Sequence, residues 1–119
     1  MTRTVLPHRR VSTTMFVKHV GNDGNEHEFL VTFGFGREAP LKVREVFCGS
    51  PKVGSDMQAF INDSCIAISL LLQHGMTMSE LASAFGENRP EGSSSGPPSS
   101  PLGSIAKKAV EIERGLLDA

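Results

Sequence analysis

Six polar side chains, in three adjacent pairs, are the best candidates for binding a ligand. One pair consists of two arginines near the N-terminus, whose guanidinium groups match a phosphate or a carboxylate. The second pair stands where a helix is expected to begin and where backbone N–H groups attract anions. The third pair stands where that helix is expected to end and includes a histidine. The pairs are Arg9 and Arg10, Ser55 and Asp56, and Gln73 and His74.

Each pair also has a simpler structural role. Ser55 and Gln58 match a capping box, in which the serine accepts a hydrogen bond from an early backbone N–H group. Asp56 would repel an anion at the same helix start. A histidine at a helix C-terminus interacts favourably with the helix dipole, and arginines in a terminal arm are usually solvated. A small-ligand or nucleotide site at these six residues is therefore the alternative to a structural role.

The sequence shows no pattern typical of catalysis or metal binding. Cys65 falls on the apolar side of an expected helix, which favours a buried, unreactive thiol. Cys48 follows an expected strand and should be partly exposed, but no His or Lys beside it would lower its pKa. The four histidines are scattered, and two isolated cysteines lack the spacing of a zinc site. We expect no catalytic residue, metal or cofactor in this chain.

Charge and hydropathy narrow the classes of partner. Twelve basic and 13 acidic residues give a net charge of −1, which creates no field to attract a polyanion. No apolar run approaches the ~18 residues that cross a membrane, and the N-terminal segment lacks the apolar core of a signal peptide. Two cysteines without a disulfide framework suit a reducing compartment. We expect a cytoplasmic protein without a membrane partner.

Three stretches alternate between apolar and polar residues, as the strands of a half-buried sheet do. They cover residues 13–20, 27–35 and 41–47. The second is the clearest, and its apolar face consists of Phe29, Val31, Phe33 and Phe35. In the third, Glu45 interrupts the apolar face, which indicates a bulge or a register shift. That face is expected to carry Leu41, Val43 and Phe47.

Helical periodicity follows the third strand. Residues 55–74 carry apolar residues on nearly every side, which predicts a long central helix that is buried on most of its surface. Gly75 suits the left-handed position that ends a helix. Thr77 and Glu80 form a second capping box, at the start of a short helix that ends at Gly86.

These elements predict an α+β fold, in which a three-stranded antiparallel meander packs against three helices. Ser100 and Pro101 fit the N-cap and first position of the last helix. That helix would dock on the core or on a neighbouring protomer, because a linker rich in Gly, Ser and Pro precedes it. The expected segments are an N-terminal arm at 1–10, a core at 11–86, the linker at 87–101 and the C-terminal helix at 102–119.

Several short motifs follow one another in the order that is typical of one protein family. They are Val31–Phe35, Glu45–Phe47, Gly54–Asp56, Ala67–Gly75, Thr77–Leu81 and Gly96–Gly103. Over roughly residues 9–110, the chain resembles the TSCPD domain found at the C-terminal end of adenosylcobalamin-dependent ribonucleotide reductases. The Thr-Ser-Cys-Pro-Asp string that names the family is present only as Asn-Asp-Ser-Cys-Ile-Ala at residues 62–67, without the Pro-Asp.

The resemblance implies a role in ribonucleotide reduction and deoxynucleotide synthesis, as a non-catalytic regulatory or interaction module. The adenosylcobalamin would belong to the larger reductase, because 119 residues are too few for the catalytic barrel. We expect a homodimer, or docking to a ribonucleotide reductase polypeptide.

A DNA-binding helix-turn-helix over residues 66–86 is a further alternative. Its second helix would offer Ser79, Glu80 and Ser83 to the groove, with no basic residue from 76 to 88. Without basic residues, the phosphate contacts that dominate affinity for DNA are missing. We therefore expect no nucleic-acid partner.

Overall fold

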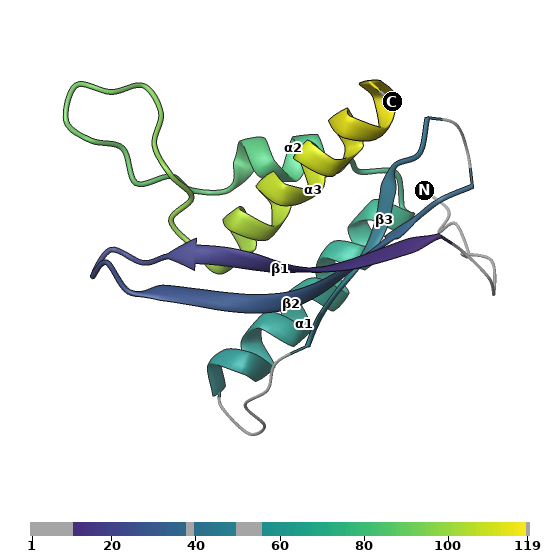
Figure 1. Ribbon diagram of the computed structural model, residues 1–119, viewed down its shortest axis with the longest axis horizontal. Helices are drawn as coiled ribbons and strands as arrows, with labels where there is room; N and C mark the ends of the chain where they lie inside the picture. Colours follow the sequence, from purple (N-terminus) through teal and green to yellow (C-terminus); the bar gives the residue numbers. More distant parts are fainter. Residues whose placement is uncertain (1–10, 38–39, 50–55, 119) are drawn as a thin grey trace.

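The switch from alternating to helical periodicity in the sequence corresponds to an α+β fold in the computed structural model. The structure describes residues 11–37, 40–49 and 56–118, and the side chains of these as far as residue 115. Three strands are followed by three helices, as expected (Figure 1). Their bounds are β1 Ser12–Val20, β2 Glu26–Phe35, β3 Val43–Gly49, α1 Asp56–Gln73, α2 Met78–Ala84 and α3 Pro101–Asp118.

The strands form an antiparallel meander with β2 in the centre. β1 pairs with β2 in one continuous register, from Ser12 opposite Gly34 to Val20 opposite Glu26. The turn between them includes Gly24 at a φ of 81°, a backbone conformation that glycine adopts without strain. The expected alternation is present: Val17 is buried on the helix side, whereas Phe16 is 66% exposed on the opposite side.

β3 pairs with β2 through an irregularity at the position that Glu45 indicated. Gly34 lies opposite Glu45, but the next residue, Phe35, lies opposite Val43, so β3 contains one extra residue, Arg44. The bulge reverses the expected sidedness beyond it. Phe47 was expected on the core face, yet it is 48% exposed, and its neighbours Val46 and Cys48 are buried instead. The strand begins at Val43, two residues later than expected.

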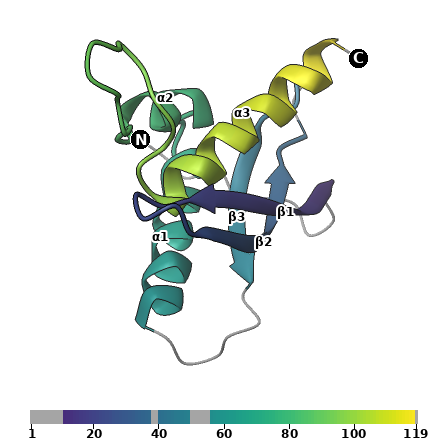
Figure 2. The ribbon, with the colours of Figure 1, turned by 60° about the vertical axis from the view of Figure 1, so that its left-hand side comes forward.

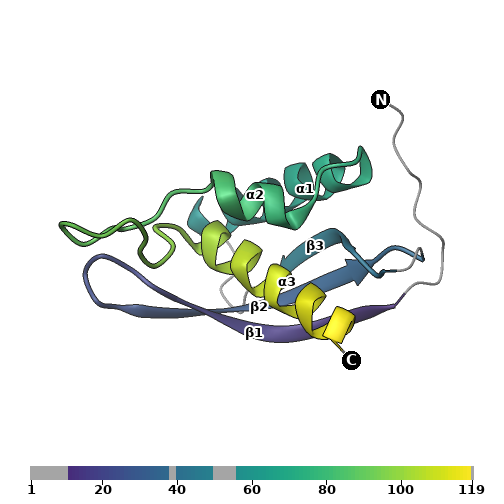
Figure 3. The same cartoon turned by 90° about the horizontal axis from the view of Figure 1, so that it is seen from above.

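All three helices lie on the same side of the sheet (Figures 2 and 3). α1 packs against β3, α3 packs against β1, and α2 packs against α3. The expectation that this long helix is buried on most sides was wrong, because α1 packs mainly against β3 and buries one face only. Its buried residues are Ile61, Cys65, Ile68, Ser69, Leu72 and Gln73.

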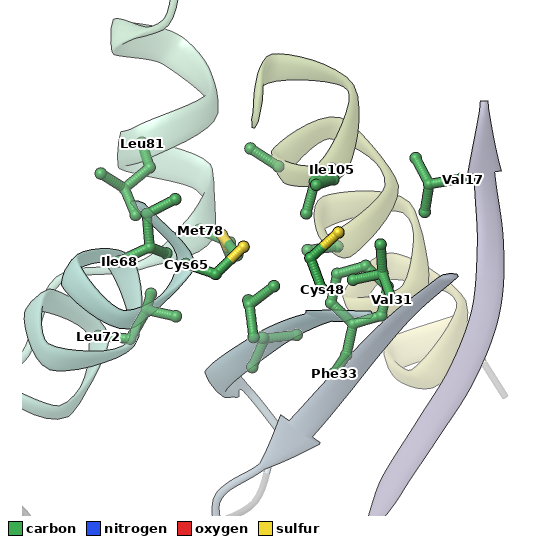
Figure 4. Packing of buried hydrophobic residues seen from close by; sticks show 14 of the residues in the cluster. Val17, Val31, Phe33, Cys48, Cys65, Ile68, Leu72, Met78, Leu81 and Ile105 are labelled. Carbon is green, nitrogen blue, oxygen red and sulfur yellow. The ribbon is translucent and has the colours of Figure 1, made fainter. Parts of the chain in front are cut away.

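One apolar core fills the space between the sheet and the helices (Figure 4). The inner face of β2 forms its floor with the four residues that the alternation predicted, which are all buried. Each helix adds residues from its inner face. These include Cys65, Ile68 and Leu72 from α1, Met78 and Leu81 from α2, and Ile105, Ala106 and Ala109 from α3.

The helix ends follow the predicted capping signals wherever the structure describes them. Gly75 has a φ of 109°, and Met76 N–H donates back to the Leu71 carbonyl at 3.1 Å, which closes α1 in a Schellman arrangement. At the start of α2, Thr77 and Glu80 form both hydrogen bonds of the capping box. The Ser100 hydroxyl accepts from Gly103 N–H at 3.1 Å at the start of α3.

The ends of the Gly/Ser/Pro segment before α3 are tied together. Asn88 N–H donates to the Pro97 carbonyl at 2.8 Å, and Ser99 N–H donates to the Gly86 carbonyl at 3.0 Å. A Cβ at Gly96 would run into the Asn88 backbone, so this close approach requires glycine. The segment forms a closed loop, and α3 returns onto the core of its own chain.

The sidedness of the sheet can be tested with two phenylalanines. Phe33 has no exposed surface, so Phe33→Ala should lower the free energy of unfolding by about 3–5 kcal/mol through lost burial and a cavity. Phe16 is 66% exposed, and Phe16→Ala should cost less than about 1 kcal/mol. Urea unfolding followed by circular dichroism measures both. Similar losses in the two variants would contradict the one-sided core.

Candidate functional site

The structure does not bring the described candidate ligand residues together. Arg9, Arg10 and Ser55 lie outside the described residues. Asp56 is exposed at the first position of α1, and His74 follows the last. At 1.5 Å per residue, the two are about 27 Å apart along the helix. A ligand site that combines these residues therefore stays a prediction. Asp56, Gln73 and His74 line neither of two clefts found elsewhere on the described surface.

The polar residues at the end of α1 fasten the helix to β3. Gln73 is buried, and its Nε2 donates to the Arg44 carbonyl at 3.4 Å. Arg44 in turn donates from Nη1 to the carbonyls of Leu72 and Met76, at 3.2 Å each. His74 Nδ1 lies 2.8 Å from the Leu70 carbonyl. The terminal carbonyls of a helix need such partners. These side chains therefore have a structural role, because they join the end of α1 to the bulge in β3 that contains Arg44.

Both cysteines are free thiols inside the core (Figure 4). Cys65 is buried, as expected, but Cys48 is also buried, at 8% exposure, where the sequence indicated partial exposure. The bulge in β3 accounts for the difference, because it turns Cys48 toward the helices. Burial raises the pKa of Cys48, and burial together with the nearby Cys48 raises the pKa of Cys65 to about 12.

These pKa values predict unreactive thiols. At pH 8, a thiol with a pKa of about 12 is ionised in roughly one molecule in ten thousand, and the thiolate is the nucleophile. The folded protein should therefore react very slowly with Ellman's reagent, and should release two equivalents quickly in urea. Fast labelling of either cysteine in the folded protein would contradict this arrangement.

Two buried polar side chains that the sequence reading missed cover the outer edge of β3. The Ser69 hydroxyl of α1 accepts from Val46 N–H at 2.8 Å and donates to the Val46 carbonyl at 3.2 Å. A carboxylate oxygen of Glu113, on α3, accepts from Val43 N–H at 2.7 Å. Both residues interrupt apolar helix faces. A polar residue at such a position is the signal in the sequence that could have indicated a buried hydrogen bond. With Gln73, they satisfy backbone groups that an edge strand would otherwise expose.

The opposite edge of the sheet, along β1, has no such cover from any residue that the structure describes. The Val11 carbonyl accepts from Phe35 N–H at 2.9 Å, so the backbone of Val11 points toward β2. Because successive residues of a strand alternate in direction, Thr14, Phe16 and Lys18 point their N–H and C=O groups away from β2. Among the described residues, these groups take part in no other hydrogen bond.

A cleft of about 380 Å³ lies along this open edge, between β1 and α3. Phe16 and Pro98 supply apolar surface to it. Its charged lining residues are Lys18, Glu28, Lys107, Lys108 and Glu111. Lys108 pairs with Glu111 at 3.3 Å, whereas Lys107 is exposed and forms no ion pair with any described residue. The sheet side of the lining therefore combines the ring of Phe16 with the oppositely charged Lys18 and Glu28, and the helix side carries two lysines and one glutamate.

Next to the cleft, a buried histidine joins β1 to α3. His19 is only 5% exposed, and its Nδ1 lies 2.8 Å from the Ser104 hydroxyl. The pKa of His19 is lowered, first because burial disfavours the charged ring and second because His27, directly opposite on β2, repels it. This residue therefore favours its neutral form where α3 meets the sheet.

The lowered pKa of His19 predicts a loss of stability in mild acid. In the unfolded chain a histidine titrates near its usual pKa of about 6.5, so the unfolded state binds the proton more readily than the folded state. The contribution of His19 is full above that pH and decreases as the pH falls below it. The melting temperature should drop from about pH 7 to pH 5, and His19→Gln should flatten this drop. His27→Gln is the control that retains most of it.

Two apolar surfaces remain uncovered among the described residues. The outer sheet face carries Phe16, Leu30 and Phe47, which are between 40% and 66% exposed. Phe16 lies directly opposite Leu30, and Thr32, the second residue after Leu30, lies opposite Phe47, so the three belong to one surface. The outer face of α1 is the second surface. It consists of Met57, Phe60, Ile66, Leu70 and Leu71.

The described part of the chain contains no group of three His, Cys, Asp or Glu residues placed to hold a metal ion. Within the same ranges, no helix has the length and apolar character needed to cross a membrane.

Comparisons with protein-family models, with curated proteins and with solved structures found no match to this chain. Its surfaces therefore have to be interpreted from their own chemistry.

Proposed function

We propose that this protein is a non-catalytic interaction module that binds another polypeptide through its uncovered apolar surfaces. The observation that carries the proposal is the outer sheet face, where Phe16 and Phe47 expose large apolar rings side by side with Leu30. Contiguous apolar surface on a small domain marks an interaction site more often than scattered single residues do. The aromatic rings also supply the rigid contact area that binding hot spots favour.

The polypeptide we propose as partner is a ribonucleotide reductase, which would make this protein an accessory component of deoxynucleotide synthesis. The support is the resemblance of its ordered motifs to the TSCPD domain. Several of those motifs have structural roles in this fold: Val31–Phe35 lies in the central strand, Gln73–Gly75 closes α1, and Thr77–Leu81 begins α2. Under this proposal, any adenosylcobalamin belongs to the reductase.

A second copy of the chain is the other partner that the uncovered surfaces can accommodate. Phe16, Leu30 and Phe47 lie on one face of the sheet, and a two-fold axis through such a face makes it self-complementary. The reductase is preferred because the resemblance points to it and nothing comparable points to a dimer.

Affinity capture tests the proposed partner. The tagged protein should retain an adenosylcobalamin-dependent ribonucleotide reductase from a lysate of its own organism, identified by mass spectrometry. Two double variants, Phe16→Ser with Phe47→Ser and Phe60→Ser with Leu71→Ser, each remove one exposed apolar surface without disturbing the core. At least one of them should lose the reductase, because truncating apolar hot-spot residues commonly lowers affinity tenfold or more.

The isolated protein should reduce no ribonucleotide when given adenosylcobalamin and a dithiol, and its melting temperature should not change with nucleotides. Reduction by the protein alone would contradict the proposal. A stabilisation of several degrees by one nucleotide, with no reductase captured, would favour the alternative of a nucleotide-binding domain. A stable dimer that captures no reductase would favour self-association.

A further inference from the structure

We propose that the open edge of β1 binds an extended peptide segment of a partner protein as a fourth strand of the sheet. The segment would carry apolar side chains on the outer sheet face and acidic side chains toward α3. The inference rests on the proposed role as an interaction module, but it does not depend on which protein supplies the segment.

The backbone of β1 provides the first argument. Thr14, Phe16 and Lys18 point their N–H and C=O groups outward along the edge, as the Val11–Phe35 hydrogen bond requires. An incoming strand can pair with these groups, which is the basis of recognition by strand addition. The three residues belong to a strand of nine residues without a bulge in its register, so the edge is regular and long enough for such pairing.

The contrast between the two edges provides the second argument. On β3, Ser69 occupies the outward N–H and C=O groups of Val46, and Glu113 occupies the N–H group of Val43. This protein therefore covers part of the β3 edge with its own side chains. On β1, no described residue does so, although α3 runs close by (Figure 3). An exposed, unprotected edge on a small sheet invites pairing with another chain.

The cleft provides the third argument and the chemistry of the partner. An added strand would extend the sheet beyond β1. Its side chains would point alternately toward the outer side of the sheet and toward α3. On the outer side they would meet the ring of Phe16, which favours apolar residues, with the charged Lys18 two residues further along the strand. On the helix side they would meet Lys107 and Lys108. Because these two lysines outnumber Glu111, the one glutamate on the helix side of the lining, acidic residues are favoured there.

The same charges argue against a second copy as the occupant. If β1 of a second copy paired antiparallel with β1, each copy would turn the same residues toward the helix side of the sheet. They are Thr13, Met15, Val17 and His19, none of which is acidic. Nothing would complement the unpaired Lys107. A heterologous segment with alternating apolar and acidic residues fits both walls.

Two synthetic peptides test the proposal on the full chain. The probe is a fluorescein-labelled peptide of alternating valine and glutamate, nine residues long to match β1, and its analogue carries lysine in place of glutamate. Fluorescence anisotropy should show binding of the glutamate peptide only. Lys107→Glu should weaken that binding by about tenfold and should favour the lysine analogue. Arg37→Glu makes the same charge change at an exposed residue that does not line the cleft, and should alter neither affinity.

N-methylation of the peptide tests the backbone pairing without changing the protein. In an antiparallel strand, the residues that pair with Phe16 and Lys18 lie on the outer face with them, so methylating the valine nitrogens should abolish binding. Methylating the glutamate nitrogens should leave it intact. A parallel strand would reverse the two results, because its hydrogen bonds come from the alternate residues. In either case, hydrogen exchange followed by NMR should show new protection of the Phe16 and Lys18 amides.

Several results would overturn the proposal. The first is binding that persists both when the valine nitrogens and when the glutamate nitrogens are methylated. The second is binding without hydrogen-exchange protection of the β1 amides, and the third is no binding of the glutamate peptide. A dimer that protects the β1 amides in the absence of peptide would show that a second copy occupies the edge. The capture of a reductase is an independent readout. If the protein captures the reductase but no peptide binds, the β1 site is wrong and the proposed function stands.

Discussion

The one-sided burial of β2 is the constraint on which the rest of the structure depends. This strand is paired on both edges and buries four large apolar side chains on a single face. All three helices must therefore lie on that side, because it is where apolar surface can leave water. No helix or strand in the described ranges forms a layer on the other face of the sheet. The uncovered rings of Phe16 and Phe47 follow directly from this arrangement.

The polar groups of the fold divide the molecule into a closed side and an open side. Around β3, the bulge at Arg44 displaces backbone groups that Ser69, Gln73 and Glu113 then satisfy. Arg44 itself binds the end of α1. A buried N–H or C=O group without a partner is costly, so these contacts fix the two long helices against β3. Around β1, only His19 and Ser104 link helix to sheet by side-chain hydrogen bonding among the residues that the structure describes, and none of these residues covers the strand edge.

The candidate residues illustrate why sequence identifies functional groups more readily than functional sites. Gln73 and His74 were singled out because a polar pair at a helix end can bind a ligand. In the folded chain, Gln73 contacts the backbone of β3 and His74 a carbonyl of its own helix. Ser69 and Glu113 were overlooked because their partners are 23 and 70 residues away. The cleft beside β1 combines residues from a strand and a helix that are about 90 residues apart, and no local pattern signals it.

The sequence by itself determined the local elements: the period-2 strands, the glycine at the end of α1, the capping box of α2 and the serine that begins α3. These depend on side chains within a few residues of one another, and the local patterns therefore contain them. Only the tertiary structure decided that Phe47 faces out and Cys48 in, because a single extra residue in β3 inverts every later position. It also decided that α1 buries one apolar face and exposes the other. Periodicity shows that a face is apolar, but what covers that face depends on the position of elements far away in the chain.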